Sequence, residues 1–299
     1  MSSSDNPQFE TPPVNVTPPT VEAMTPDTVP ADLLVPSMSA SIQTPVPTGP
    51  APVENPVFSG WDVLQIFGLT LFTMFVLQIL VLFGARWVAY PGASLGDLAQ
   101  KPVLLLLSQF LIYAAVALFM VLVVEGKYHV RFWQAIRWNW PQSGWRLLAL
   151  GGIMLFTLNL LQYFLPIPKD TPFEKLFARP RDAYLLSLIA VTLGPLMEEL
   201  FFRGFLYPVL ARRLGVAWGI FLTALPFGLM HMPQYGYAWG AVLVIFLVGV
   251  VCTVVRAAMK SVGASFLVHV GYNGTQMVIA AILTDGFRHM DKTGMLLFR

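Results

Sequence analysis

The chain has 299 residues, of which 56% are hydrophobic and only 11% are charged, and its mean hydropathy is +0.66. Soluble globular proteins carry about 25% charged residues, so this composition excludes an ordinary soluble domain and indicates an integral membrane protein. The formal net charge of +2 does not indicate nucleic-acid binding, because the Lys and Arg residues lie scattered between apolar runs.

Residues 1–57 form a proline-rich tail that contains 13 of the 24 prolines, six acidic residues and no Lys or Arg. A segment of this composition cannot bury an apolar core, and we expect it to be disordered.

Long apolar runs recur from residue 60 onward. A helix of about 20 apolar residues spans a bilayer, and Gly194-Pro195 interrupts one run because proline lacks an amide donor. We therefore expect an all-α, polytopic membrane helix bundle of about 7–8 transmembrane helices. The runs lie at about 61–85, 102–124, 145–166, 183–213, 216–232, 236–256 and 261–284.

The segment 125–144, between the second and third runs, has a different character. Trp133, Trp138 and Trp140 alternate there with basic residues, as is typical of chain lying at the lipid headgroups. Alternate loops carry similar numbers of Lys and Arg, so the positive-inside rule leaves the orientation open.

Ionisable residues at membrane depth are confined to the later runs. The residues are Glu198, Glu199, Arg203, His231 and His269. A charge at the centre of a bilayer costs about 2.5–3.5 kcal/mol, so such residues normally face a polar interior and mark a functional site.

Helical register separates the two adjacent glutamates. Glu199 and Arg203 are four residues apart and share a helix face, so we expect a structural ion pair between them. Glu198 is rotated by about 100° from that face, and its own i+4 neighbour is Phe202. An unpaired carboxylate in an apolar environment has a raised pKa and can act as a general base.

Two further polar sites, one with a single histidine and one with a histidine and an asparagine, have an ordinary structural interpretation when each is taken alone. His231, followed by Pro233, is typical of a helix end. His269 and Asn273 share one helical face and can bond between helices, and Gly271 beside them permits a close helix approach. Together, one carboxylate, two imidazoles and one amide are the groups that a hydrolytic centre needs.

The HExxH pattern of ordinary zinc proteases is absent, and the single Cys252 excludes a cysteine-rich metal site and an intrachain disulfide.

Three motifs occur in order: "EELFFR" at 198–203, "FGLMH" at 227–231 and "HVGYN" at 269–273. They resemble the EExxxR, FxxxH and HxxxN motifs of the CPBP intramembrane proteases, which include the CAAX prenyl endopeptidases and the bacteriocin-processing and immunity (Abi) proteins. The resemblance covers roughly residues 183–285.

The resemblance implies an intramembrane endopeptidase that acts on membrane-embedded or lipid-anchored peptides. It implies that Glu198, assisted by His231, activates water, and that His269 and Asn273 form an oxyanion hole. The supporting residues would be Glu199, Arg203 and Phe227. A divalent metal such as zinc, if present, would be held by Glu198, His231 and His269. The protein would be multi-pass, in the cell membrane if the source is bacterial.

On this basis we divide the chain into four parts. They are the tail 1–57, the N-terminal transmembrane helices and interfacial loop 58–182, the catalytic membrane core 183–285 and the C-terminal tail 286–299.

Two other functions stay open at this point. One is a non-catalytic immunity or binding protein on the same scaffold. The other is a proton-coupled transporter, in which intramembrane Glu and His would relay protons. Transporters often have paired broken helices in two halves, whereas here only the run with "LGPLMEE" is broken.

Overall fold

A computed structural model describes residues 55–166 and 171–289, and these residues form helices and no strand. The predicted tail up to residue 54 and the predicted C-terminal tail from residue 290 lie outside the described residues. The long helices are α1 (Gly60–Val88), α3 (Pro102–Val121), α5 (Gly144–Gln162), α7 (Pro180–Val191), α8 (Leu193–Glu199), α9 (Tyr207–Leu214), α10 (Val216–Leu229), α11 (Trp239–Met259) and α12 (Val262–Leu283). Shorter elements are α2 (Leu95–Ala99), η2 (Leu122–Lys127), α4 (Phe132–Ala135), α6 (Pro172–Lys175), η3 (Leu200–Leu206) and η4 (Met232–Tyr235).

The protein is an all-α, multi-pass integral membrane protein, as predicted. The described residues contain 6 helical segments long and apolar enough to cross a membrane, and α10 is a shorter apolar helix. In the most apolar 18-residue stretch of α1, only 6% of the residues are buried within the protein. Its apolar side chains therefore face outward, where lipid solvates them and where helical hydrogen bonds leave no backbone group unpaired.

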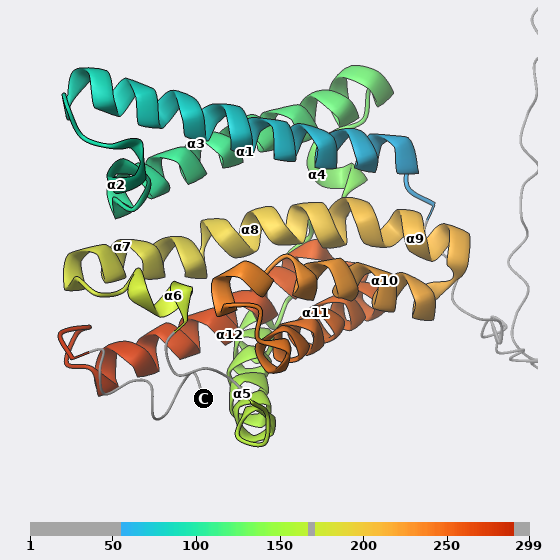
Figure 1. Ribbon diagram of the computed structural model, residues 1–299. Helices are drawn as coiled ribbons and strands as arrows, with labels where there is room; N and C mark the ends of the chain where they lie inside the picture. Colours follow the sequence, from blue (N-terminus) through green and yellow to red (C-terminus); the bar gives the residue numbers. More distant parts are fainter. Residues whose placement is uncertain (1–54, 167–170, 290–299) are drawn as a thin grey trace, which may run out of the picture. The chain divides into compact units, whose positions relative to one another are not determined.

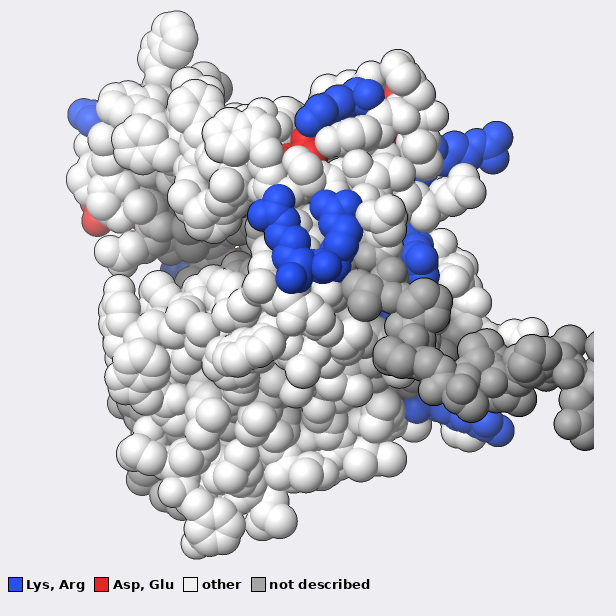
Figure 2. All heavy atoms as spheres, turned by 90° about the vertical axis from the view of Figure 1, so that its right-hand side faces the viewer, with Lys and Arg blue, Asp and Glu red and all other residues white. Residues whose placement is uncertain are grey.

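The helices lie in layers (Figure 1). α1 and α3 run side by side, the rod formed by α7, α8, η3 and α9 follows beneath them, and α10, α11, α12 and α5 lie on the other side of that rod. Basic side chains gather on the end of the bundle seen in Figure 2, which is the right-hand side of Figure 1. This end includes the last turn of α9, with Arg212 and Arg213.

The rod is buried on both sides. Phe205 packs with Ile66 and Met120 in an apolar cluster formed with α1 and α3. Phe202 points into a second cluster, which contains Leu155 of α5 together with residues of α10, α11 and α12. Lipid tails are as apolar as these side chains, so in a bilayer such packing stabilises the fold through close van der Waals contact between the helices. The rod that carries the two glutamates is therefore held from both layers.

A buried acidic residue fixes the start of α1. Ser59 caps the helix and Asp62 completes a capping box. The Asp62 carboxylate, which has no exposed surface, also accepts hydrogen bonds of 2.6 Å from Lys127 Nζ and from the Tyr128 hydroxyl. These bonds attach the beginning of α1 to the end of η2, so α1 and α3 form one unit.

Glycine allows α5 and α12 to cross closely, as predicted for Gly271. A Cβ atom on Gly271 would lie 2.3 Å from the carbonyl oxygen of Leu148, and a Cβ atom on Gly151 would lie 2.2 Å from that of Val268. Both distances are far below van der Waals contact, so neither position accepts a side chain without separating the helices. The crossing holds the His269 segment against α5.

The interruption of the rod lies slightly before Gly194-Pro195. α7 ends at Val191, and Thr192, with φ −116° and ψ −77°, joins it to α8. Proline in a helix clashes with the carbonyl four residues earlier, which here belongs to Val191, whereas proline is tolerated in a first turn. The rod then changes to the π-helical η3 directly after Glu199, and π-helical turns are frequent at functional sites.

Candidate active site

A cavity of about 680 Å³ lies at the centre of the bundle. Its lining includes Glu198 of α8, His231 at the end of α10, and His269 and Asn273 of α12. The three motifs are separated by tens of residues in the sequence, and the fold brings their polar side chains to one cavity.

The adjacent glutamates point in different directions. Glu199 and Arg203 have no exposed surface, and Arg203 Nη1 lies 2.9 Å from Glu199 Oε1. Arg203 also donates hydrogen bonds to the carbonyl oxygen of Gly249 at 2.9 Å and to the Thr253 hydroxyl at 3.2 Å. The ion pair predicted from the helical register is present, and it ties the rod to α11.

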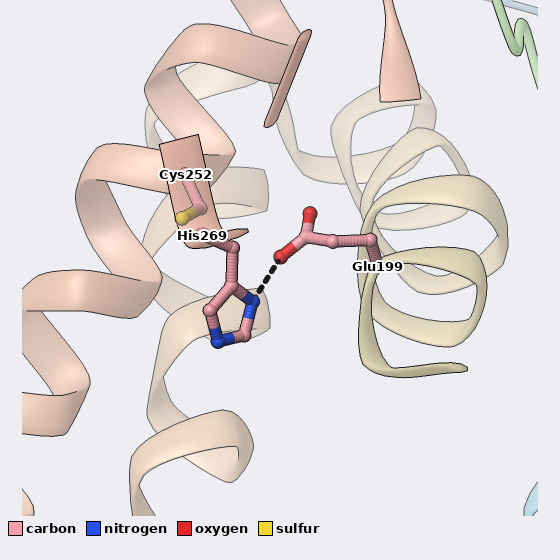
Figure 3. A group of neighbouring side chains, drawn as sticks. All are labelled: Glu199, Cys252 and His269. Atoms are coloured by element: carbon pink, nitrogen blue, oxygen red, sulfur yellow. Dashed lines mark hydrogen bonds and ion pairs between the residues drawn. The ribbon is translucent and has the colours of Figure 1, made fainter. Parts of the chain in front are cut away.

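Glu199 has two further partners, both on α12. Ser265 Oγ donates to Glu199 Oε2 at 2.6 Å, and His269 Nδ1 lies 3.0 Å from Glu199 Oε1 (Figure 3). Both carboxylate oxygens are therefore occupied by protein groups. Glu199 orients the imidazole of His269 and does not itself face the cavity.

Glu198 lines the cavity, and its side chain is 19% exposed. Its Oε1 lies 3.9 Å from His231 Nε2 and its Oε2 lies 3.7 Å from His269 Nε2. These separations exceed a hydrogen bond and are short enough for one water molecule or one ion to contact the carboxylate and an imidazole together.

Hydrogen bonding fixes the orientation of both imidazoles. His231 Nδ1 lies 2.7 Å from the carbonyl oxygen of Phe227, which can only accept, so Nδ1 carries the proton in the neutral ring. His269 Nδ1 faces the Glu199 carboxylate in the same way. In the neutral tautomers both Nε2 atoms are unprotonated acceptors that face Glu198.

Phe227 lies behind both histidines. Its ring centroid is 5.1 Å from that of His231 and 5.8 Å from that of His269. The guanidinium of Arg203 also lies over this ring, 4.5 Å from its centroid. Phe227 thereby separates the buried ion pair from the cavity and limits the rotation of the imidazoles.

Asn273 contributes an amide to the cavity wall. Its Nδ2 donates to the carbonyl oxygen of Ala190 in α7 at 2.7 Å. This bond uses one of the two N–H groups and fixes the plane of the amide, which leaves the second N–H available to a ligand in the cavity.

Tyr235 in η4 is a further hydroxyl on the cavity wall. Burial raises the pKa of Tyr235 to about 12, and the negative charges of Glu174 and Glu198 add to this shift. The hydroxyl is therefore protonated at neutral pH and is a potential hydrogen-bond donor.

Two sets of side chains come into question as metal ligands, one predicted from the motifs and one found by the proximity of its ligand atoms. The cavity set is the predicted one, namely Glu198, His231 and His269. The second set is Glu199, Cys252 and His269, whose ligand atoms lie within 4.8 Å of one another in the interior (Figure 3). In the second set, Glu199 is already paired with the positively charged Arg203, and this charge would repel a metal cation bound there. The ligand atoms of the cavity set do not all lie within 4.8 Å of one another, although Glu198 lies 3.7–3.9 Å from Nε2 of each histidine.

The sequence interpretation missed several members of this site. Ser265 precedes His269 by four residues, and that spacing was a signal for a third polar group on one helical face. Cys252 and Thr253 had no such signal, because only the packing of α11 against the rod brings them close.

Comparison with known proteins agrees with the motifs. The model of the family described as "Type II CAAX prenyl endopeptidase Rce1-like" matches residues 180–275. No curated protein and no solved structure matches the chain. The resemblance carried by the three motifs is thus confirmed over α7 to most of α12, while α1, α3 and α5 lie outside the matched region.

Proposed function

We propose that the protein is an intramembrane endopeptidase of the CAAX-protease type, in which Glu198 is the general base. The observation that carries this proposal is the position of Glu198, in a cavity between membrane-length helices, with an imidazole Nε2 atom 3.7–3.9 Å from each carboxylate oxygen. A water molecule held there has two kinds of acceptor for its protons.

The reaction follows from these groups. Glu198, assisted by His231, removes a proton from the water as its oxygen attacks the scissile carbonyl carbon. The carbonyl oxygen gains negative charge and accepts hydrogen bonds from the second N–H of Asn273 and from Nε2 of a protonated His269. Glu199 and Glu198 flank the imidazole of His269, at 3.0 Å from Nδ1 and 3.7 Å from Nε2. Glu198 then returns the proton to the leaving nitrogen, so no net proton is consumed by the protein.

The cavity residues also fit a divalent ion such as zinc. Two imidazoles and one carboxylate are a common catalytic ligand set, and each imidazole is oriented through Nδ1 by an acceptor, Phe227 O or Glu199. When bound, such an ion lowers the pKa of a coordinated water and polarises the substrate carbonyl.

The surroundings favour a hydrophobic peptide substrate. Much of the cavity wall is apolar, with residues such as Leu105, Leu186 and Val244, and the helices around it are membrane spans. A membrane-embedded or lipid-anchored peptide can supply both an apolar anchor and a peptide bond. The description of the matching family adds prenylated CAAX peptides as the first class to test.

Cleavage by the purified protein tests the proposal. A pool of peptides, prenylated at a C-terminal CAAX sequence or unmodified and apolar, is incubated with wild type and with Glu198→Gln in detergent, and products are identified by mass spectrometry. We expect cleavage by wild type, and a loss of about 10²–10⁴ in rate in Glu198→Gln, which is typical of removing a general base. Binding of peptide without cleavage by wild type would instead assign a non-catalytic binding protein.

A further inference from the structure

The side chains of the three motifs offer more hydrogen-bond acceptors than donors to the cavity. Glu198 offers two carboxylate oxygens, and the neutral forms of His231 and His269 offer unprotonated Nε2 atoms. Asn273 has committed one N–H to Ala190. A peptide carbonyl that becomes an oxyanion needs donors, and the three motifs supply two of them, the second N–H of Asn273 and, in its protonated form, Nε2 of His269.

A donor faces the cavity from the opposite wall, on α3. Tyr113 and Gln109 both line the cavity, and they are four residues apart on one face of the helix. The Gln109 side chain lies one turn before Tyr113 on α3, close enough to interact with its hydroxyl. A phenol oxygen can accept and donate at the same time, so an amide that donates to it fixes its position and leaves the O–H free.

The Tyr113 hydroxyl approaches the rod at Gly194. The Tyr113 hydroxyl oxygen lies 3.9 Å from the point that a Cβ atom on Gly194 would occupy. Gly194 precedes Glu198 by four residues in α8, and helical side chains lean toward the N-terminus and cover the preceding turn. The Glu198 side chain therefore covers the same turn that the Tyr113 hydroxyl approaches from α3.

We propose that Tyr113 is a further catalytic residue, whose hydroxyl donates a hydrogen bond to the scissile carbonyl oxygen as this oxygen gains negative charge. Gln109 is its positioning residue. This inference rests on the proposed endopeptidase function. It places a catalytic group on α3, outside the region that matches the family, so the N-terminal helices complete the active site and do not serve only as a membrane anchor.

The chemistry separates Tyr113 from a residue that only binds substrate. An oxyanion donor interacts more strongly with the transition state than with the bound peptide, so its removal lowers kcat and leaves KM nearly unchanged. For a single donor the loss is about 10²–10³ in kcat. The same donor also stabilises a bound phosphinate analogue of the peptide, which mimics the tetrahedral intermediate.

The test compares Tyr113→Phe with wild type on a peptide that wild type cleaves. We expect kcat to fall about 10²-fold, KM to change by less than about twofold, and the inhibition constant of the matching phosphinate peptide to rise by about the same factor as kcat falls. Tyr163→Phe is the matched control, because Tyr163 is 72% exposed at the end of α5, and it should behave as wild type.

The outcomes separate this inference from the proposed function. If Glu198→Gln is inactive while Tyr113→Phe retains wild-type kcat and phosphinate affinity, the role of Tyr113 is refuted and the endopeptidase stands. If Tyr113→Phe raises KM alone, Tyr113 binds substrate and is not an oxyanion donor. If Glu198→Gln is fully active, or if wild type cleaves no peptide of the pool, the proposed function fails and this inference fails with it.

Discussion

The buried ion pair of the rod gives the sharpest stability prediction. Arg203→Ala removes the contact with Glu199, the two hydrogen bonds to α11 and the contact with the Phe227 ring. It also leaves the Glu199 carboxylate buried without its counter-charge. Breaking a fully buried pair in this way costs about 3–5 kcal/mol. At about 2–4 °C per kcal/mol for a domain of this size, the melting temperature should fall by about 6–20 °C.

The assay is thermal unfolding of the detergent-solubilised variants, followed by intrinsic fluorescence. The matched control is Arg288→Ala, which breaks an exposed ion pair with Asp285 and should change the melting temperature little. The double variant Arg203→Met with Glu199→Gln should be less destabilised than the sum of the two single changes, because no charge is left stranded. A melting temperature for Arg203→Ala that equals the control would refute the reasoning about this pair.

Three further predictions concern other parts of the site and fold. Asn273→Ala should lower kcat by about 10²–10³ with little change in KM, as measured by steady-state peptide cleavage; a change confined to KM would contradict an oxyanion role. Gly151→Ala should lower the melting temperature strongly because its Cβ would meet backbone at 2.2 Å, whereas Gly84→Ala, with nothing within 4 Å, should not lower it; equal effects would contradict the close crossing. After zinc loading, elemental analysis should find the same zinc content per protein in Cys252→Ser as in wild type and a lower zinc content in His231→Ala. A lower zinc content in Cys252→Ser alone would favour the buried ligand set of Glu199, Cys252 and His269.

The sequence predicted those parts of the structure that depend on local register and composition. Apolar runs of membrane length predicted the helices, and the four-residue spacing of Glu199 and Arg203 predicted their ion pair. The break in the rod was placed a few residues late, because proline acts on the carbonyl four residues before it.

The remainder of the site depends on contacts between distant helices, which register cannot reveal. Gln109 and Tyr113 are uncharged, so the pattern of ionisable residues at membrane depth does not reveal them, although their four-residue spacing in an apolar span is visible in the sequence. The bond between Glu199 and His269 joins residues 70 positions apart and requires the packing of α12 against the rod.

The measurement that tests the central claim most directly compares the two neighbouring glutamates, one changed at a time. Glu198→Gln, which keeps the size of the side chain, should retain the wild-type melting temperature and lose about 10²–10⁴ in kcat on a cleaved peptide. Glu199→Gln should instead lower the melting temperature, since it strands the buried Arg203. Wild-type turnover in Glu198→Gln would contradict the assignment of this carboxylate as the base.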